Sequence, residues 1–273
     1  MSELIWFEGS WTKTGSIPVS AFKRAWAYGE LIFETFRSDS GNIPFLTRHV
    51  ARIEQSLEFM DSAVVPGNLA ELFQSWSVQA HEQMKERHLA VRVNAYRAGF
   101  GLFDGSSEWS FFVMPRAIES AECMSSKPIQ LELLPYKDGL FPGRGGMKTS
   151  NYLPYLRGLN ADSNREVVLL GAEGQLLDGM RSHLVFLMKS GEYVSVNEEH
   201  GMLRSLARQR SLDWFGEKGI IGIGGRIYQW ELPQVRSAWA GNAVWGYRPV
   251  SGIGEIIMEK RELMPVGEFW NWD

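Results

Sequence analysis

The sequence predicts an α/β protein that is organised in two parts. Three observations carry this prediction: two amphipathic helical segments in the first half, a strand-like alternation directly after them, and short apolar strands beyond residue 128. The chain has 273 residues, enough for one large domain or two ordinary ones whose cores need no disulfide or metal support. We therefore expect an N-terminal α/β domain over 1–115, a linker over 116–127 and a C-terminal domain over 128–273.

Helical periodicity is clear in two segments of the first half. In residues 49–61 apolar side chains recur every three or four positions, and residues 68–87 repeat the pattern. Alternation with a period of two then predicts a strand over 89–96, and a second short strand follows over 110–114. Residues 32–46, with a Ser-Gly-Asn turn in the middle, are typical of a hairpin.

The second half is predicted to be rich in strands. Short apolar runs separated by glycine-containing turns predict strands from Ile129 onward and over 167–170, 184–188 and 192–196. One helix is expected over 203–215. The glycine-rich stretch 219–225 lacks the Lys-Ser/Thr of a phosphate loop and leads into an aromatic run, so it predicts a strand with tight turns.

Composition excludes several classes of protein. The net charge is −4, so no global attraction to nucleic acid or to an anionic membrane is visible. No run approaches the roughly 18 uninterrupted apolar residues of a membrane span, and no basic region followed by an apolar run opens the chain. The single cysteine, Cys123, excludes an intrachain disulfide and a cysteine-cluster metal site. We expect a cytoplasmic protein with no nucleic-acid, membrane or metal partner.

Four short segments carry the chemistry expected of this chain, and they lie at 28–37, 49–52, 145–153 and 174–184. A lysine after two glycines, as at Lys148, is by itself usually an exposed loop residue, but four motifs in order are far more specific. On these residues the chain resembles the class IV (fold-type IV) pyridoxal-phosphate enzymes. That family includes branched-chain aminotransferases, D-amino-acid aminotransferases and aminodeoxychorismate lyases.

The resemblance implies a fold, a cofactor and an assembly. The fold would be a two-domain fold-type IV structure with an N-terminal α/β sandwich and a C-terminal pseudo-barrel that carries the catalytic lysine. The cofactor would be pyridoxal 5′-phosphate, held in the cleft between the two domains. Two copies of the chain would form a homodimer in which the partner chain helps to line each site.

The resemblance also implies a role for each matched residue. Lys148 would form the Schiff base with the cofactor aldehyde, so its site must favour the neutral, nucleophilic amine. Arg52 would bind the cofactor phosphate, because a guanidinium offers paired donors. Tyr152 would hydrogen-bond the phenolic oxygen, and Asp178 would face the pyridine nitrogen and keep the ring protonated. Further cofactor contacts are implied at a helix start and at a C-terminal turn, by Leu206, Ala207, Asn242 and Ala243.

Several residues depart from the family pattern. Asp178 replaces the usual glutamate and is one methylene shorter, and Glu30 replaces an aspartate. Arg181 and His183 stand where the family has a small residue and an asparagine, and Ala207 lacks a threonine hydroxyl. These changes cluster near the expected cofactor position, so they leave cofactor binding expected and the substrate class open.

An α-carboxylate on the substrate needs a cationic partner, and arginine is the natural one. The candidates are Arg37, Arg92 and Arg97. Arg97 resembles the carboxylate arginine of the D-amino-acid and lyase branches. Three other residues instead resemble pocket positions of the branched-chain branch: Tyr28, Phe33 and Arg37. Tyr152 also favours that branch, whereas the residues from 242 to 250 are more similar to the lyase.

The resemblance therefore leaves more than one activity open. We expect first an aminotransferase that moves an amino group between an amino acid, branched-chain-like or other, and a 2-oxo acid, through a pyridoxamine form and with ping-pong kinetics. The alternative is an aminodeoxychorismate lyase, which eliminates pyruvate and gives 4-aminobenzoate. A third hypothesis is a catalytically degenerate homologue that binds pyridoxal phosphate. The preferred amino acid and its stereochemistry stay open.

Overall fold

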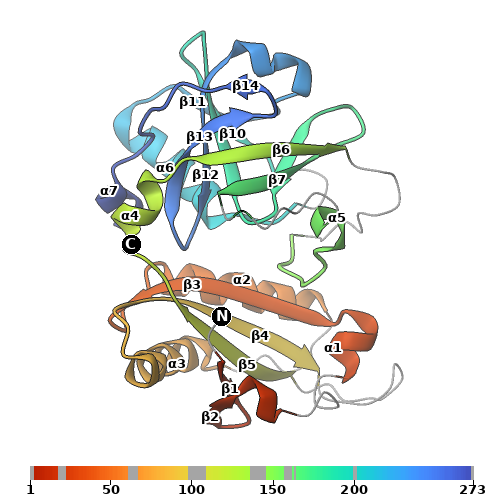
Figure 1. Ribbon diagram of the computed structural model, residues 1–273, viewed down its shortest axis with the longest axis vertical. Coiled ribbons are helices and arrows are strands. Elements are labelled where there is room, and N and C mark those ends of the chain that lie inside the picture. The colour runs from red at the N-terminus through yellow and green to blue at the C-terminus, as the bar shows by residue number, and fades with distance from the viewer. Residues whose placement is uncertain are drawn as a thin grey trace. The chain divides into compact units, whose positions relative to one another are not determined.

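The chain forms two compact units in a computed structural model (Figure 1). Unit 1 comprises Met1–Glu119 and Met147–Asn151, and unit 2 comprises Ser120–Gly146 and Tyr152–Asp273. The structure describes residues 3–17, 23–60, 67–97, 109–135, 146–156, 162, 164–198 and 202–271. No helix in these ranges is long and apolar enough to cross a membrane.

Unit 1 contains a five-stranded antiparallel sheet in its described residues, with the strand order β2-β1-β5-β4-β3. Its long strands pair over their whole length, from Leu31 opposite Tyr96 to Asp39 opposite His88. The strands are β1 (Leu4–Phe7), β2 (Ser10–Lys13), β3 (Leu31–Asp39), β4 (His88–Arg97) and β5 (Trp109–Ala117). Strand β3 lies at one end of this order, so its outer edge is open to a further chain segment.

Helices α2 (Leu46–Phe59) and α3 (Leu69–Met84) pack on one face of this sheet, and the short helix α1 (Lys23–Tyr28) precedes β3 (Figure 1). Their apolar stripes meet alternate residues of β3 and β4, because successive strand side chains point to opposite faces. Phe36 of β3 is fully buried and stacks on Phe73 of α3, with ring centroids 5.3 Å apart. This face holds the core of unit 1.

Most elements predicted for the first half are confirmed. The helices predicted over 49–61 and 68–87 are α2 and α3, although residue 61 lies outside the described residues. Helix α3 ends at Met84 because Lys85 takes a left-handed conformation with φ +57°. The predicted hairpin over 32–46 is wrong, because β3 pairs with β4 along its whole length. Only one bridge joins Asp39 to Asn42 in the described residues, and Phe45, with φ +61°, leads the chain into α2.

Unit 2 contains a mixed sheet that has nine strands in its described residues. The strand order is β11-β10-β9-β12-β13-β6-β7-β8, and β14 pairs with β13. Three pairs are parallel, β10–β11, β6–β13 and β6–β7, and the others are antiparallel. The strands are β6 (Ile129–Pro135), β7 (Arg165–Leu170), β8 (Leu176–Gly179), β9 (His183–Met188), β10 (Tyr193–Val196), β11 (Gly222–Gly225), β12 (Val235–Asn242), β13 (Gly246–Ile253) and β14 (Ile256–Ile257).

Four α-helices of unit 2 lie in the described residues: α4 (Ala121–Ser126), α5 (Leu153–Leu156), α6 (Leu206–Lys218) and α7 (Val266–Trp270). Helix α6 is the helix predicted over 203–215. It begins after Ser205, whose Oγ caps the first turn, and it ends at Gly219 with φ +63°, a conformation that favours glycine. The predicted strands over 167–170, 184–188, 192–196 and 219–225 are confirmed as β7, β9, β10 and β11.

The boundary between the units falls between Glu119 and Ser120, inside the predicted linker over 116–127. Most of that stretch is regular structure, since it holds the last residues of β5 and all of α4. The lysine segment Met147–Asn151 groups with unit 1, whereas we expected it in the C-terminal domain. The reason is backbone pairing with β3: the Phe33 N–H donates to the Lys148 carbonyl at 2.8 Å, and the Ser150 N–H donates to the Leu31 carbonyl at 3.0 Å.

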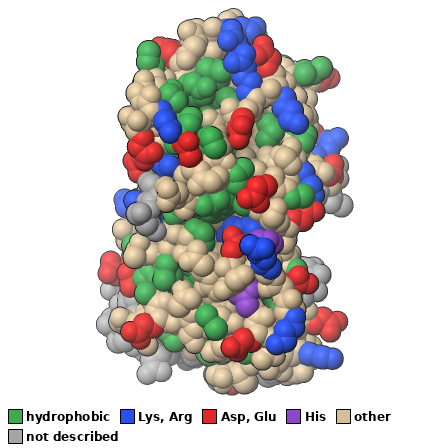
Figure 2. Space-filling model, turned by 90° about the vertical axis from the view of Figure 1, so that its left-hand side faces the viewer, with side chains coloured by type: hydrophobic (Ala, Val, Ile, Leu, Met, Phe, Trp, Pro, Cys, Tyr) green, Lys and Arg blue, Asp and Glu red, His purple; other side chains and the backbone are tan. Residues whose placement is uncertain are grey.

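Charged side chains of both signs are spread over the described part of the face in Figure 2, with hydrophobic side chains between them. The near-balanced composition, 28 basic and 32 acidic residues, is consistent with this pattern. A surface of this kind has no extended field of one sign on that face, so any anion must be bound by a local arrangement of donors.

The core of unit 1 makes a direct prediction for stability. Replacing Phe36 with Ala removes a fully buried ring between β3 and α3, and we expect the free energy of unfolding to fall by about 3–5 kcal/mol. Phe59→Ala is the matched control, because Phe59 is 65% exposed and should change stability by less than about 0.5 kcal/mol. Urea titrations of the two variants measure both effects, and equal losses would contradict this packing.

Candidate active site

Lys148 lies beside the open edge of β3 and next to the ring of Phe33. Its Nζ is 4.9 Å from the ring centroid, and the guanidinium carbon of Arg92 is 3.5 Å from the same centroid. Arg92 is further held by Asn94 Oδ1, at 2.8 Å from Nε, and by Ser150 Oγ, at 2.9 Å from Nη2. Unit 1 therefore brings an amine and a guanidinium together against one aromatic ring.

Arg52 lies in α2 and is held by the buried carboxylate of Glu34. Its Nε donates to Glu34 Oε2 at 2.8 Å and its Nη2 donates to Oε1 at 2.5 Å, so the pair is bidentate. The Glu34 side chain is completely buried, and the Arg52 side chain is 9% exposed. Burial alone would raise the pKa of Glu34, but the charge of Arg52 and the hydrogen bonds from His49 and Arg52 outweigh it and hold that pKa well below its usual range.

His49 completes this buried cluster from the preceding turn of α2. Its Nδ1 lies 3.0 Å from Glu34 Oε1. Burial lowers the pKa of His49, and the charges of Arg52 and Lys148 lower it further against the opposing pull of Glu34. The imidazole is therefore neutral, and we assign its proton to Nδ1, which donates to the carboxylate. Lys148, on the other face of β3, is thus close enough to the cluster to act on it electrostatically.

In unit 2, the start of α6 presents backbone N–H groups. Ser205 Oγ accepts from the Arg208 N–H at 3.4 Å, and the Ser205 N–H donates to Glu198 Oε1 at 2.7 Å. Within the described residues, the N–H groups of Leu206 and Ala207 have no hydrogen-bond acceptor. Such a helix start suits an anion, because the orphan donors and the helix dipole both favour negative charge.

Asp178 and Tyr152 also lie in unit 2. Asp178 is in β8, and its Oδ2 accepts from the Leu203 N–H at 3.1 Å, which ties β8 to the segment that leads into α6. Tyr152 packs against Tyr155 with ring centroids 6.1 Å apart. These contacts orient both side chains, and their roles toward a cofactor stay predictions.

Asn242 organises the turn between β12 and β13. Its Oδ1 accepts from the Val244 N–H at 2.8 Å and from the Trp245 N–H at 3.1 Å, while its Nδ2 donates to the Arg181 carbonyl at 2.9 Å. The side chain thus shapes the turn that contains Ala243. The predicted roles of Asn242 and Ala243 toward a cofactor stay predictions.

The two unusual residues after Asp178 both have partners within unit 2. Arg181 donates to the fully buried carboxylate of Glu166, with Nε 2.9 Å from Oε2. His183 Nε2 lies 2.9 Å from Ser195 Oγ, which in turn lies 3.1 Å from Ser211 Oγ in α6. Burial, with a smaller effect of Arg208, lowers the pKa of His183 to about 3, so this imidazole is neutral at physiological pH.

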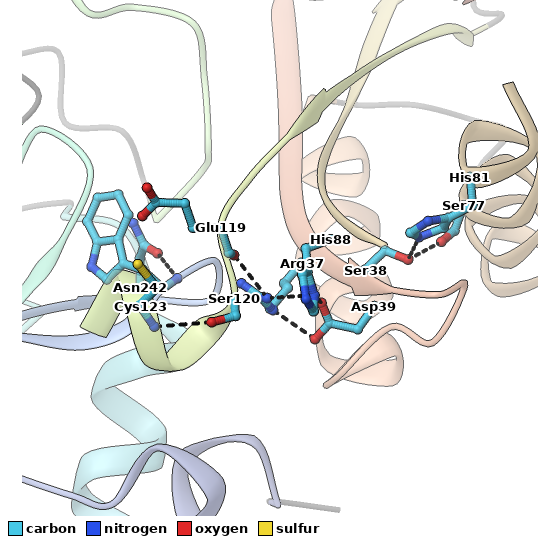
Figure 3. Close-up of polar contacts among 11 residues, drawn as sticks. Arg37, Ser38, Asp39, Ser77, His81, His88, Glu119, Ser120, Cys123 and Asn242 are labelled. Carbon is cyan, nitrogen blue, oxygen red and sulfur yellow. Dashed lines mark hydrogen bonds and ion pairs between the residues drawn. The ribbon is translucent and has the colours of Figure 1, made fainter. Parts of the chain in front are cut away.

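Arg37 is engaged at the far end of β3. Its Nε donates to Asp39 Oδ2 at 2.8 Å and its Nη2 donates to the Glu119 carbonyl at 3.2 Å (Figure 3). His88 Nδ1 lies 2.6 Å from Asp39 Oδ1. These contacts fasten neighbouring strand ends within unit 1, which is a structural role for the guanidinium predicted to bind substrate.

The other predicted substrate residues lie elsewhere in unit 1. Arg97 donates to the Met60 carbonyl at 2.6 Å, and its Nε is 3.5 Å from Glu30 Oε1. Tyr28 is 49% exposed at the end of α1. Of the four predicted substrate residues, Phe33 is the one that the structure places directly beside the amine of Lys148.

Two buried polar clusters escaped the sequence interpretation. One is Glu34 with His49 and Arg52; the other joins Ser38, Ser77 and His81, with Ser38 Oγ 2.6 Å from Ser77 Oγ and 2.8 Å from His81 Nε2 (Figure 3). Glu34 and Ser38 alternate with apolar residues on the core face of β3. A polar residue at a strand position that otherwise faces the core indicates that it has a polar partner there, and the sequence alone already showed this alternation.

Comparison with known proteins agrees with the fold and with these motifs. The family described as "Amino-transferase class IV" matches residues 31–253. An aminodeoxychorismate lyase of Bacillus subtilis (strain 168) is 22% identical over 269 residues, which cover 93% of this chain and 87% of that protein.

Solved structures show the same fold. The branched-chain aminotransferase of Thermoproteus uzoniensis, solved with norvaline, superposes with a TM-score of 0.80 at 17% identity, covering 98% of this chain and 92% of that one. A hypothetical aminotransferase from Mycobacterium tuberculosis, in its pyridoxal-phosphate-bound form, superposes with a TM-score of 0.77 at 17% identity, covering 98% and 95%. The predicted fold class, fold-type IV, is confirmed.

The fold and the four motifs define a class IV pyridoxal-phosphate enzyme. This chain belongs to the class IV aminotransferase family, whose match spans most of both units. Each unit holds groups that suit such a cofactor. Unit 1 has a lysine amine for its aldehyde and a positioned guanidinium for its phosphate. Unit 2 has a carboxylate for its ring nitrogen and, among the described residues, helix-start N–H groups with no acceptor for its phosphate. No group of three or more potential metal ligands occurs among the described residues.

The neutral His183 predicts a pH dependence of stability. Its pKa is about 3 in the folded chain and about 6.5 when unfolded, so the unfolded chain binds more protons between these values. Stability is therefore lost as the pH falls from about 6.5 toward 3, by at most about 1.4 kcal/mol per pH unit.

His183→Asn, which introduces the usual family residue, removes this titration. Urea unfolding at pH 6, 5 and 4 should show a shallower decline for the variant than for the wild-type protein. Parallel declines would contradict a neutral, buried His183.

Proposed function

We propose that this protein is a pyridoxal-phosphate-dependent aminotransferase that moves an amino group between an amino acid and a 2-oxo acid. The observation that carries the proposal is the placement of Lys148, whose amine lies on the Phe33 ring beside Arg92, in a chain that belongs to the class IV family. A buried arginine, Arg52, in the same unit supplies the donor expected for the cofactor phosphate.

Each residue then has a defined task. When bound, pyridoxal phosphate supplies an electron sink for charge at the substrate α-carbon. In unit 1, Arg52 would bind the phosphate, and the Lys148 amine would hold the cofactor aldehyde and move a proton at the substrate α-carbon. In unit 2, the N–H groups of Leu206 and Ala207 would bind the phosphate, Asp178 would hold a proton on the ring nitrogen, and Tyr152 would donate to the phenolic oxygen.

Arg92 is the residue that we assign to the substrate carboxylate. Its guanidinium shares the Phe33 ring with Lys148, and Asn94 and Ser150 fix its orientation. Arg37 contacts Asp39 and a backbone carbonyl at the other end of β3, which supports a structural task for it. A planar, oriented guanidinium suits a carboxylate, because it offers two parallel donors.

A second candidate activity is supported by a specific observation. The Bacillus subtilis relative, which matches over nearly the whole length of both chains, is an aminodeoxychorismate lyase. That reaction would use the same Lys148 and would release pyruvate and 4-aminobenzoate from aminodeoxychorismate. Pyruvate formation without any amino-acid-dependent change in cofactor absorbance would favour the lyase over the aminotransferase.

The family resemblance supports two further inferences about the protein in solution. We infer a homodimer, which light scattering on the purified chain would test against a monomer of 31.0 kDa. We also infer a cytoplasmic location. An activity panel should contain both enantiomers of each amino acid together with the 2-oxo acids.

The proposal makes a prediction for Lys148. The wild-type protein loaded with pyridoxal phosphate should change its visible absorbance when an amino donor is added, and a 2-oxo acid should reverse the change, because transfer occurs in two half-reactions. Lys148→Ala should abolish this cycle and lower turnover by at least about a thousandfold, since the variant lacks the amine that carries the cofactor and moves the proton.

Arg37→Lys is the matched control, because it alters a basic residue of the same unit whose contacts are with Asp39 and Glu119. We expect its absorbance cycle to persist. An unchanged cycle in Lys148→Ala would overturn the proposed function.

A further inference from the structure

The contacts of Glu34 are unusual for a glutamate in the middle of a strand. Oε2 accepts from Arg52 Nε, and Oε1 accepts from Arg52 Nη2, from His49 Nδ1 and from the Thr35 N–H at 3.0 Å. Four donors thus converge on one carboxylate that has no exposed surface. This arrangement fixes the plane of the Arg52 guanidinium, because both bonds of a bidentate pair must be coplanar.

The charges of the cluster cancel. Glu34 is ionised, Arg52 is cationic and His49 is neutral, so the carboxylate and the guanidinium sum to zero. An anion that binds Arg52 therefore binds a cluster whose net charge is zero. The strength of this binding depends on where the N–H groups of Arg52 point and much less on the net charge of the cluster.

We propose that Glu34 is a positioning residue for the cofactor phosphate, holding Arg52 in the one orientation in which its guanidinium can donate to the anion. His49 supports Glu34 by donating to the same carboxylate oxygen that receives Arg52 Nη2. The inference rests on the proposed function, since it takes Arg52 to be the phosphate ligand. Glu34 itself touches no part of the cofactor in this scheme.

The proposal separates orientation from charge, because the two predict opposite signs for one variant. Glu34→Gln keeps the size of the side chain and removes its negative charge, so the cluster becomes net positive. If charge dominated, the phosphate would bind more tightly to the variant. If orientation dominates, the phosphate binds more weakly, because the amide NH2 that replaces one carboxylate oxygen is a donor, so the two-oxygen bidentate pair with Arg52 is lost.

The test measures the affinity of the apoprotein for two probes, pyridoxal 5′-phosphate and pyridoxal, by titration of protein fluorescence. Both probes carry the aldehyde that meets Lys148, and only one carries the phosphate. The ratio of the two dissociation constants therefore isolates the phosphate contribution from damage to the rest of the site. We expect Glu34→Gln to lower the preference for the phosphorylated probe by about tenfold or more.

Ser38→Ala is the matched control. Ser38 lies four residues further along the same face of β3, it is buried, and its hydroxyl bonds Ser77 and His81 without touching Arg52. It should lower the melting temperature and leave the ratio unchanged. If Glu34→Gln does not fold, Glu34→Asp replaces it: the charge stays, the shorter side chain cannot reach both Arg52 nitrogens, and the ratio should fall.

The outcomes distinguish the two levels of inference. A wild-type protein that binds neither probe would overturn the proposed function. A wild-type protein that prefers the phosphorylated probe, together with a glutamine or aspartate variant whose ratio is unchanged or raised, would overturn only the positioning role of Glu34. A lowered ratio in the Glu34 variant and an unchanged ratio in Ser38→Ala support it.

Discussion

The backbone pairing between the lysine segment and the outer edge of β3 is the constraint on which the candidate site of unit 1 depends. Two hydrogen bonds, from the Phe33 N–H to the Lys148 carbonyl and from the Ser150 N–H to the Leu31 carbonyl, fix this segment. Because strand side chains alternate, adjacent residues of β3 then serve both faces of the sheet. Phe33 meets the lysine amine on one face, and Glu34 holds Arg52 on the other. A shift of one residue in the pairing of β3 with β4 would exchange the faces on which Phe33 and Glu34 lie.

Local patterns predicted much of the structure. The periodicity of 3.6 predicted α2 and α3, and the alternation around Val91 predicted β4. The prediction that failed concerned a pairing between strands that are far apart in the sequence. Residues 32–37 carry the strand pattern of a hairpin, but their partner is β4, some sixty positions away, and no local rule selects that partner. For the same reason the sequence could not show that Lys148 pairs with β3.

Two residues that depart from the family pattern have hydrogen-bonding partners in the structure that the sequence motif does not show. Arg181 replaces a small residue, and the buried carboxylate of Glu166 receives its guanidinium. His183 replaces an asparagine, and Ser195 and Ser211 supply its hydrogen-bonding environment beneath α6. Glu166 and His183 are both buried, and an unpaired polar group at either position would cost about 1–3 kcal/mol. These substitutions are therefore matched by residues far away in the sequence, a relation that a single motif does not reveal.

The completion of unit 1 by residues 147–151 also bears on how the chain is made. Until those residues leave the ribosome, the outer edge of β3 lacks the partner that the described residues of unit 1 give it, although β4 and β5 can already form. A bare edge strand is a template for pairing with other chains. The first 119 residues expressed alone would consequently be prone to aggregation, because the exposed edge of β3 can pair with a strand of another chain. Synthesis of the segment that bears Lys148 thus covers part of this edge and lowers the hazard of aggregation.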